Sequence, residues 1–128
     1  MTASHLTVIT GASRGLGRAM AEQLLQAGHT VLGIARKPSP ELAEAPKAGG
    51  AELTQWEQDL SDPVAAAERL SAWLKAVDAQ RFDSVTLINN AGTVGNPAPL
   101  SRAVESELSL ALRIGLEAPM LLLSLIHI

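Results

Sequence analysis

Residues 6–17 read LTVITGASRGLG. Leu6–Thr10 is a short apolar run, typical of a strand that is buried on both faces. Gly11, Gly15 and Gly17 follow in the spacing G-x-x-x-G-x-G, and a helical pattern begins at about Gly15. Glycines let the backbone turn sharply and approach a ligand, and a helix N-terminus offers unpaired N–H groups to a phosphate. The stretch therefore predicts a pyrophosphate cradle, although a turn and helix start without any ligand would use the same glycines.

The rest of the chain alternates predicted strands with predicted helices. We expect helices at Gly15–Ala27, at Pro63–Ala79 and from near Ser101 or Ser106 onward, and strands at Thr30–Ala35, Glu52–Glu57 and Ser84–Ile88. The proline-rich segment 37–50 is expected to be mostly loop, with room for one helical turn. This order predicts an α/β fold, with about four strands in a doubly wound parallel sheet flanked by helices. We expect residues 1–128 to form a single domain.

Apolar spacing predicts which side of each helix faces the sheet. The first helix should bury Leu16, Ala19, Met20, Leu24 and Ala27, and the second should bury Val64, Ala67, Leu70, Leu74 and Val77.

Composition argues against several classes of function. The 128 residues carry a net charge of −3, which does not favour a nucleic-acid partner, and no cysteine is present for a disulfide or thiolate site. His5, His29 and His127 are not spaced as metal ligands, so we expect no metal. The apolar segment Pro119–Ile128 is too short to span a bilayer, and the first residues lack the pattern of a secretory signal. These features predict a cytoplasmic protein without membrane association.

Three motifs at the ends of predicted strands resemble those of the short-chain dehydrogenase/reductase family. They are TGASRGLG at 10–17, Asp59-Leu60, and NNAG at 89–92. The resemblance implies a Rossmann-like fold and hydride transfer between NAD(P) and a small carbonyl or alcohol. It implies that the cofactor is bound by Gly11, Ser13, Arg14, Gly15, Leu16 and Gly17, by Asp59 and Leu60 near the adenine, and by Asn90, Ala91 and Gly92 near the riboses.

Two of these polar side chains have a plainer alternative role. Asp59 could instead be a helix-capping or turn carboxylate, and Asn89 is expected to tie neighbouring strands together.

The choice of cofactor depends on the end of the second strand. Residues 35–37 read Ala-Arg-Lys, with no carboxylate to accept hydrogen bonds from a ribose 2′-hydroxyl. The guanidinium groups of Arg36 and Arg14 are suited to a 2′-phosphate. We therefore predict NADP(H), with NAD less favoured. The alternative is that Arg36 and Lys37 are ordinary solvated charges.

The residues that the family uses for proton transfer are absent. They are a tyrosine, a lysine four residues later and a serine upstream, and this chain contains no tyrosine. Gly115 stands where many family members have an asparagine, four residues before Pro119. Because proline has no N–H, the carbonyl of Gly115 should be free and the helix kinked nearby. The resemblance implies that this carbonyl holds a water of the proton relay.

The sequence favours an NADP-dependent short-chain oxidoreductase similar to sepiapterin-, benzil- and ketoacyl-reductase-like members. The chain would supply the cofactor-binding half, as an N-terminal fragment that does not catalyse the reaction alone, and a complete protein could be a homo-oligomer. The alternatives are a non-catalytic dinucleotide-binding module and an inactive fragment.

Overall fold

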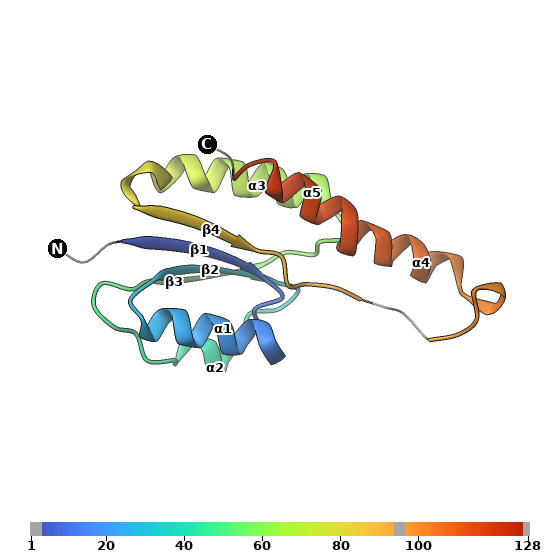
Figure 1. The fold of residues 1–128 in the computed structure, drawn as a ribbon, viewed down its shortest axis with the longest axis horizontal. Helices are drawn as coiled ribbons and strands as arrows, with labels where there is room; N and C mark the ends of the chain where they lie inside the picture. Colours follow the sequence, from blue (N-terminus) through green and yellow to red (C-terminus); the bar gives the residue numbers. More distant parts are fainter. Residues whose placement is uncertain (1–3, 94–96, 127–128) are drawn as a thin grey trace.

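Four parallel strands form one sheet in the order β3-β2-β1-β4 within residues 4–93 and 97–126, which the computed structural model describes (Figure 1). The strands are β1 His5–Thr10, β2 Thr30–Ala35, β3 Leu53–Glu57 and β4 Ser84–Ile88. The α-helices are α1 Gly15–Gln26, α2 Pro40–Ala43, α3 Pro63–Ala76, α4 Glu105–Leu112 and α5 Ala118–Leu123. Short 3-10 helices occupy η1 Ala79–Arg81 and η2 Leu100–Arg102, and a π-helical turn, η3, occupies Arg113–Glu117.

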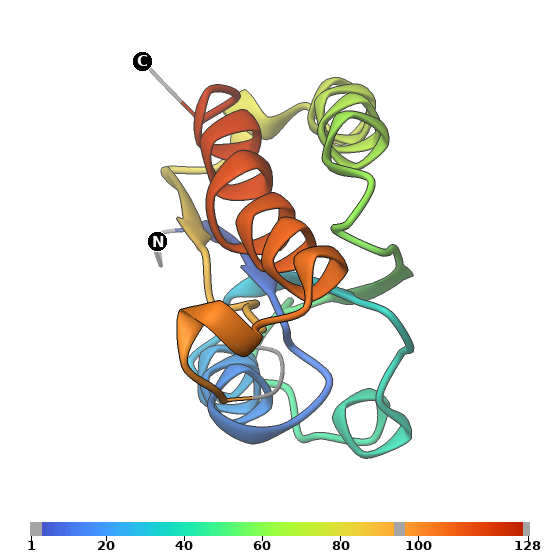
Figure 2. The same ribbon diagram turned by 90° about the vertical axis from the view of Figure 1, so that its right-hand side faces the viewer.

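The sheet lies between two layers of helices, as the predicted doubly wound fold requires. Helices α1 and α2 cover one face, α3 and α5 cover the other, and α4 extends beyond the ends of the strands (Figures 1 and 2). The predicted strands are all present, and α2 is the helical turn allowed for in segment 37–50. The second predicted helix ends at Ala76 rather than Ala79, because Asp78 adopts a left-handed φ of 53° that a helix cannot continue through.

Helix α1 contributes small residues to the core on its side of the sheet. It buries Gly17, Ala21 and Leu25, whereas Leu16 is 68% exposed. The predicted inward face was therefore partly wrong: Met20 and Leu24 pack against the core, but Leu16, Ala19 and Ala27 are exposed. The reason is that Gly17 must approach the loop before the helix, which turns the ridge of residues 17, 21 and 25 toward the sheet.

The opposite side holds the larger core. Helix α3 buries Pro63, Ala66 and Leu70, and the predicted inward residue Val64 is instead 53% exposed. Asp62 caps this helix by accepting a hydrogen bond from Ala65 N at 3.3 Å. The buried cluster on this side comprises Val8, Leu32, Ile34, Trp56, Leu60, Ala66, Leu70, Ala118 and Leu122. Successive side chains along a strand point to opposite faces of the sheet, so the same strands contribute to both cores.

Candidate functional site

A cleft of about 740 Å³ opens beyond the carboxyl ends of the strands. It is lined by Gly11, Ser13, Arg14, Gly15, Ile34, Ala35, Arg36, Lys37, Gln58, Asp59, Leu60, Asn90, Ala91, Gly92, Thr93, Leu110 and Ile114. All of the predicted cofactor-binding residues are in this set except Leu16 and Gly17. Three motifs that are far apart in the sequence therefore meet at one site, where ligands of open α/β sheets bind.

At two positions, the backbone of the glycine loop adopts a conformation that favours glycine. Gly11 and Gly15 have φ values of +69° and +56°, in the left-handed region that other residues rarely adopt. Gly11 N donates to Ile34 O at 2.7 Å, which ties the loop to the end of β2. A Cβ on Gly17 would overlap the carbonyl of Gly11 and lie 2.6 Å from Asn90 Nδ2. Gly17 therefore acts behind the loop, by permitting close packing.

The first turn of α1 is open toward the cleft. Arg14 occupies the N-cap position and its side chain makes no capping hydrogen bond. A Cβ on Gly15 would have no heavy atom within 4 Å, so no protein group packs against this side of Gly15. The first N–H groups of a helix have no partner within the helix itself. The helix start thus presents donors and partial positive charge to the cleft.

Thr10 joins the third motif to the first by hydrogen bonds. Its hydroxyl oxygen accepts hydrogen bonds from Asn90 N and Ala91 N, both at 3.0 Å. In return, Asn90 Nδ2 donates to Gly11 O at 3.2 Å. The tie expected of Asn89 is therefore made through Asn90, while Asn89 lies exposed. The sequence did not single out Thr10, although its position at the end of β1, just before the glycines, was a usable signal.

Asp59 both forms a turn and borders the cleft. Its Oδ1 accepts a hydrogen bond from Ser61 N at 2.9 Å, as in the turn alternative raised from the sequence. The main-chain N–H and hydroxyl of Ser61 lower the pKa of Asp59, with smaller contributions from the positive charges of Arg36 and Arg113. The carboxylate is therefore held in its ionised form, as a hydrogen-bond acceptor rather than an acid.

Basic side chains gather at the β2 side of the cleft. Arg14, Arg36 and Lys37 are all exposed, and all three line it. They come from the end of β2 and from the glycine loop, two segments that the hydrogen bond to Ile34 O holds together. This part of the cleft can attract an anion.

Part of the cleft lining is apolar, and of its residues the sequence singled out only Leu60. Leu110 on α4 and Ile114 on η3 line the cleft, and so does Leu60 at the end of β3. Their spacing of four residues places Leu110 and Ile114 on one side of the helix, a signal that could have found them. Such a wall suits a flat, weakly polar ring.

Near Gly115, where a kink was predicted, the helix forms the π-turn η3. Ala118 N donates to Arg113 O, five residues back, just before Pro119. A π-turn of this kind absorbs the missing N–H of a proline and is often found near functional sites. Gly115 is exposed, and a Cβ there would meet no heavy atom within 4 Å. The freedom of its carbonyl and its role in a proton relay remain predictions.

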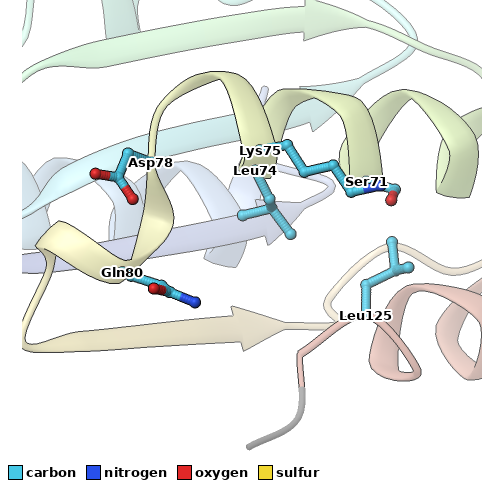
Figure 3. A pocket seen from close by; sticks show the side chains of 6 residues that line it. All are labelled: Ser71, Leu74, Lys75, Asp78, Gln80 and Leu125. Carbon is cyan, nitrogen blue, oxygen red and sulfur yellow. The ribbon is translucent and has the colours of Figure 1, made fainter.

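A second cavity, of about 440 Å³, lies toward the end of the sheet where β4 begins. Its lining residues are Ser71, Leu74, Lys75, Asp78, Gln80 and Leu125. Figure 3 shows Leu74 and Leu125 approaching it from α3 and from the segment after α5. None of the residues predicted to bind the cofactor lines this cavity, so it is separate from the candidate site.

Among residues 4–93 and 97–126, no three His, Asp or Glu side chains gather as a metal site would require. His127 lies outside the described residues. Within the same part of the chain, no helix combines the length and apolar character needed to cross a membrane.

Comparison with known proteins gives consistent matches. A family model described as short chain dehydrogenase matches residues 5–126. Benzil reductase ((S)-benzoin forming) of Bacillus subtilis (strain 168) is 37% identical over 121 residues, covering 92% of this chain and 46% of the relative. The Bacillus cereus enzyme of the same name is 33% identical over 117 residues, covering 91% of this chain and 47% of its own length. The chain thus spans about half the length of these curated relatives.

Solved structures agree with the sequence matches. A short-chain dehydrogenase/reductase from Burkholderia vietnamiensis superimposes with a TM-score of 0.83 at 35% identity, covering 95% of this chain and 57% of the other. A metagenomic short-chain oxidoreductase in complex with NADP gives a TM-score of 0.78 at 31% identity, covering 94% of this chain and 54% of the other. The fold is shared along nearly the whole chain.

Proposed function

The chain belongs to the short-chain dehydrogenase family, and on that premise we propose that it binds NADP(H) and forms the cofactor-binding part of an oxidoreductase. The observation that carries this proposal is the cleft, where the glycine loop meets the cations of Arg14, Arg36 and Lys37. No carboxylate stands at the end of β2 to favour the ribose of NAD. The metagenomic relative in complex with NADP supports the same choice. Residues 1–128 are proposed to act as one nucleotide-binding unit.

Each part of the cleft matches one part of the cofactor. The open start of α1 and the loop N–H groups would hold the pyrophosphate. Guanidinium groups of Arg14 and Arg36 would pair with the 2′-phosphate, for which their planar donors are well suited. Leu60 and Ile114 would pack against the adenine, and residues 90–92 would lie beside the riboses.

The family resemblance and the relatives' names suggest a small carbonyl or alcohol as substrate. When bound, the nicotinamide supplies or accepts a hydride. The chain contains no tyrosine to carry the accompanying proton, and Asp59 is held ionised at the cleft. We therefore propose that this chain binds the cofactor without turning over a carbonyl by itself. The missing tyrosine also favours a second candidate, a nucleotide-binding module with no reaction of its own.

The first experiment measures the binding of NADPH and NADH by isothermal titration calorimetry. Wild type should bind NADPH more tightly, and Arg36→Asp should weaken NADPH binding by about 10- to 150-fold, from 1.5–3 kcal/mol per charge-assisted contact. Lys75→Asp is a control because it makes the same charge change at the second cavity. If wild type and Arg36→Asp both bind the two cofactors equally, the proposed preference is wrong.

A second experiment addresses turnover. The chain is mixed with NADPH and benzil, the carbonyl suggested by the names of the Bacillus relatives, and NADPH oxidation is followed by absorbance. We expect binding without oxidation. Oxidation above the rate of a no-protein control would show that proton transfer proceeds without tyrosine, and would contradict this part of the proposal.

A further inference from the structure

The segment from Arg36 to Ser39 brings cations into the cleft, and β3 and the turn after it hold both of its ends. At the start, Gln58 N donates to Ala35 O at 2.8 Å. At the end, Gln55 contacts the main chain of Ser39 in both directions. Its Oε1 accepts from Ser39 N at 2.8 Å, and its Nε2 donates to Ser39 O at 2.9 Å. Two hydrogen bonds to one residue's main chain fix both its position and its orientation.

Ser39 connects this contact to the rest of the α1 side. It is only 3% exposed, and its hydroxyl oxygen accepts from Leu42 N at 3.1 Å, which caps α2. The same hydroxyl donates to Glu41 Oε2 at 3.1 Å, and that carboxylate lies 3.9 Å from Arg18 Nη1 on α1. Gln55 therefore fixes Ser39, which is also linked through Glu41 to α1, the helix that follows the glycine loop.

Only three residues lie between the two fixed ends. They are Arg36, Lys37 and Pro38, and the proline ring further restricts the backbone. Both cationic side chains are exposed at the cleft, and in residues 4–93 and 97–126 neither forms an ion pair. The segment is thus ordered before any ligand arrives, while its charges stay available. Ordering a loop in advance removes a cost that binding would otherwise carry.

From these contacts we infer that Gln55 is a positioning residue for recognition of the 2′-phosphate. It acts through Ser39 on Arg36 and Lys37, and it does not itself line the cleft. The inference rests on the proposed function. NADPH and NADH differ only in the 2′-phosphate, so loss of the Gln55 contacts weakens NADPH binding and leaves NADH binding unchanged. A purely structural role would weaken both cofactors together or neither.

The test replaces Gln55 with methionine, which has a similar length and cannot make either hydrogen bond. Dissociation constants for NADPH and NADH are measured by calorimetry for wild type, Gln55→Met and the control Gln26→Met, an exposed glutamine of α1. We expect Gln55→Met to lose about three- to tenfold in NADPH affinity, with NADH affinity within about twofold of wild type. Gln26→Met should match wild type for both. Thermal melts confirm folding, and Gln55→Thr, a good strand former, is the second variant if the first does not fold.

A coupling experiment tests the route of the effect. In an Arg36→Met/Lys37→Met background, Gln55→Met should cause no further loss of NADPH affinity, because the groups through which it acts are gone. The same three- to tenfold loss in that background would overturn the inference. If wild type prefers NADPH and Gln55→Met keeps the same ratio of NADPH to NADH affinity, the inference is wrong but the proposed function is not. A wild type that binds both cofactors equally overturns the proposed function and the inference with it.

Discussion

Replacing Gly17 with alanine should disturb the cleft from behind without removing any group that lines it. The added methyl would overlap the carbonyl oxygen of Gly11 and lie 2.8 Å from its carbon. It would also lie 2.6 Å from Asn90 Nδ2, the donor that ties the third motif to the glycine loop. The atoms it meets include backbone of the glycine loop, which cannot rotate away as a flexible side chain could. The loop or the start of α1 must therefore shift.

The size of the effect follows from two opposing terms. Forcing an extra carbon into a packed region costs about 1–3 kcal/mol, and a rigid backbone neighbour places Gly17 toward the upper end. Alanine gains at most about 1 kcal/mol over glycine in a helix. The net loss is about 2 kcal/mol in the free energy of unfolding. For a chain of 128 residues this is a fall of about 8 °C in Tm, at about 4 °C per kcal/mol.

Thermal and urea unfolding followed by circular dichroism would measure this loss. Gly115→Ala is the matched control, since a Cβ there has no heavy atom within 4 Å and its φ is not left-handed. That variant should be stabilised by about 0.5–1 kcal/mol, because alanine loses less backbone freedom on folding. A Gly17→Ala protein that melts within about 1 °C of wild type would refute the packing argument.

Three further predictions concern the hydrogen bonds to Thr10, the packing of the core and the pH dependence of stability. Thr10→Val should lower the free energy of unfolding by about 1–3 kcal/mol, because two main-chain N–H groups lose their acceptor, and Thr10→Ser should restore most of it in urea unfolding. Leu70→Ala should cost about 2–5 kcal/mol in the same assay, since Leu70 is fully buried, and a cost under about 1 kcal/mol would contradict the packing described. Burial and the neighbouring His5 lower the pKa of His29 from 6.5, so the unfolded chain binds the extra proton first and stability should fall as the pH drops through 6.5. Melts from about pH 8 to about pH 5.5 should show a weaker pH dependence in His29→Gln, and equal slopes would count against this.

The strands were readable from the sequence, whereas the helix faces were less so. The runs at Thr30–Ala35 and Ser84–Ile88 are short, apolar and bounded by turn residues, and their bounds were predicted correctly. Apolar spacing partly misplaced the buried side of α1, because it weighs Leu16 above Gly17. Glycine has no side chain to count, yet its lack of a Cβ is what lets this helix approach the glycine loop and Asn90. This close approach depends on the tertiary structure, and the hydrophobic periodicity of the sequence does not reveal it.

Parts of the candidate site were likewise predictable from the sequence, and other parts were not. Residues after the strand ends were found because parallel strands bring their carboxyl ends to one edge, and the glycine spacing marked the loop. Leu110 and Ile114 were missed because their side of the helix faces the cleft only after the chain has crossed back over the sheet. A kink was predicted near Gly115, where the π-turn is found, because its cause, a proline without an N–H, is local. Local chemistry and the meeting of the strand ends were predictable, and the position of the helix that returns over the sheet was not.

The two halves of the cleft are held by separate sets of hydrogen bonds. Thr10 fixes the motif at residues 90–92 against the glycine loop, and Gln55 fixes the segment that carries Arg36. These two anchors share no hydrogen-bonding partner, so their effects should add when Thr10→Val and Gln55→Met are combined. In the proposed binding mode, the first anchor would lie beside the parts that NADPH and NADH have in common, and the second beside the part that distinguishes them. On that proposal, changes at residues 36–39 and 55 should alter cofactor preference while the glycine loop, which depends on Gly11 and Gly17, stays as it is.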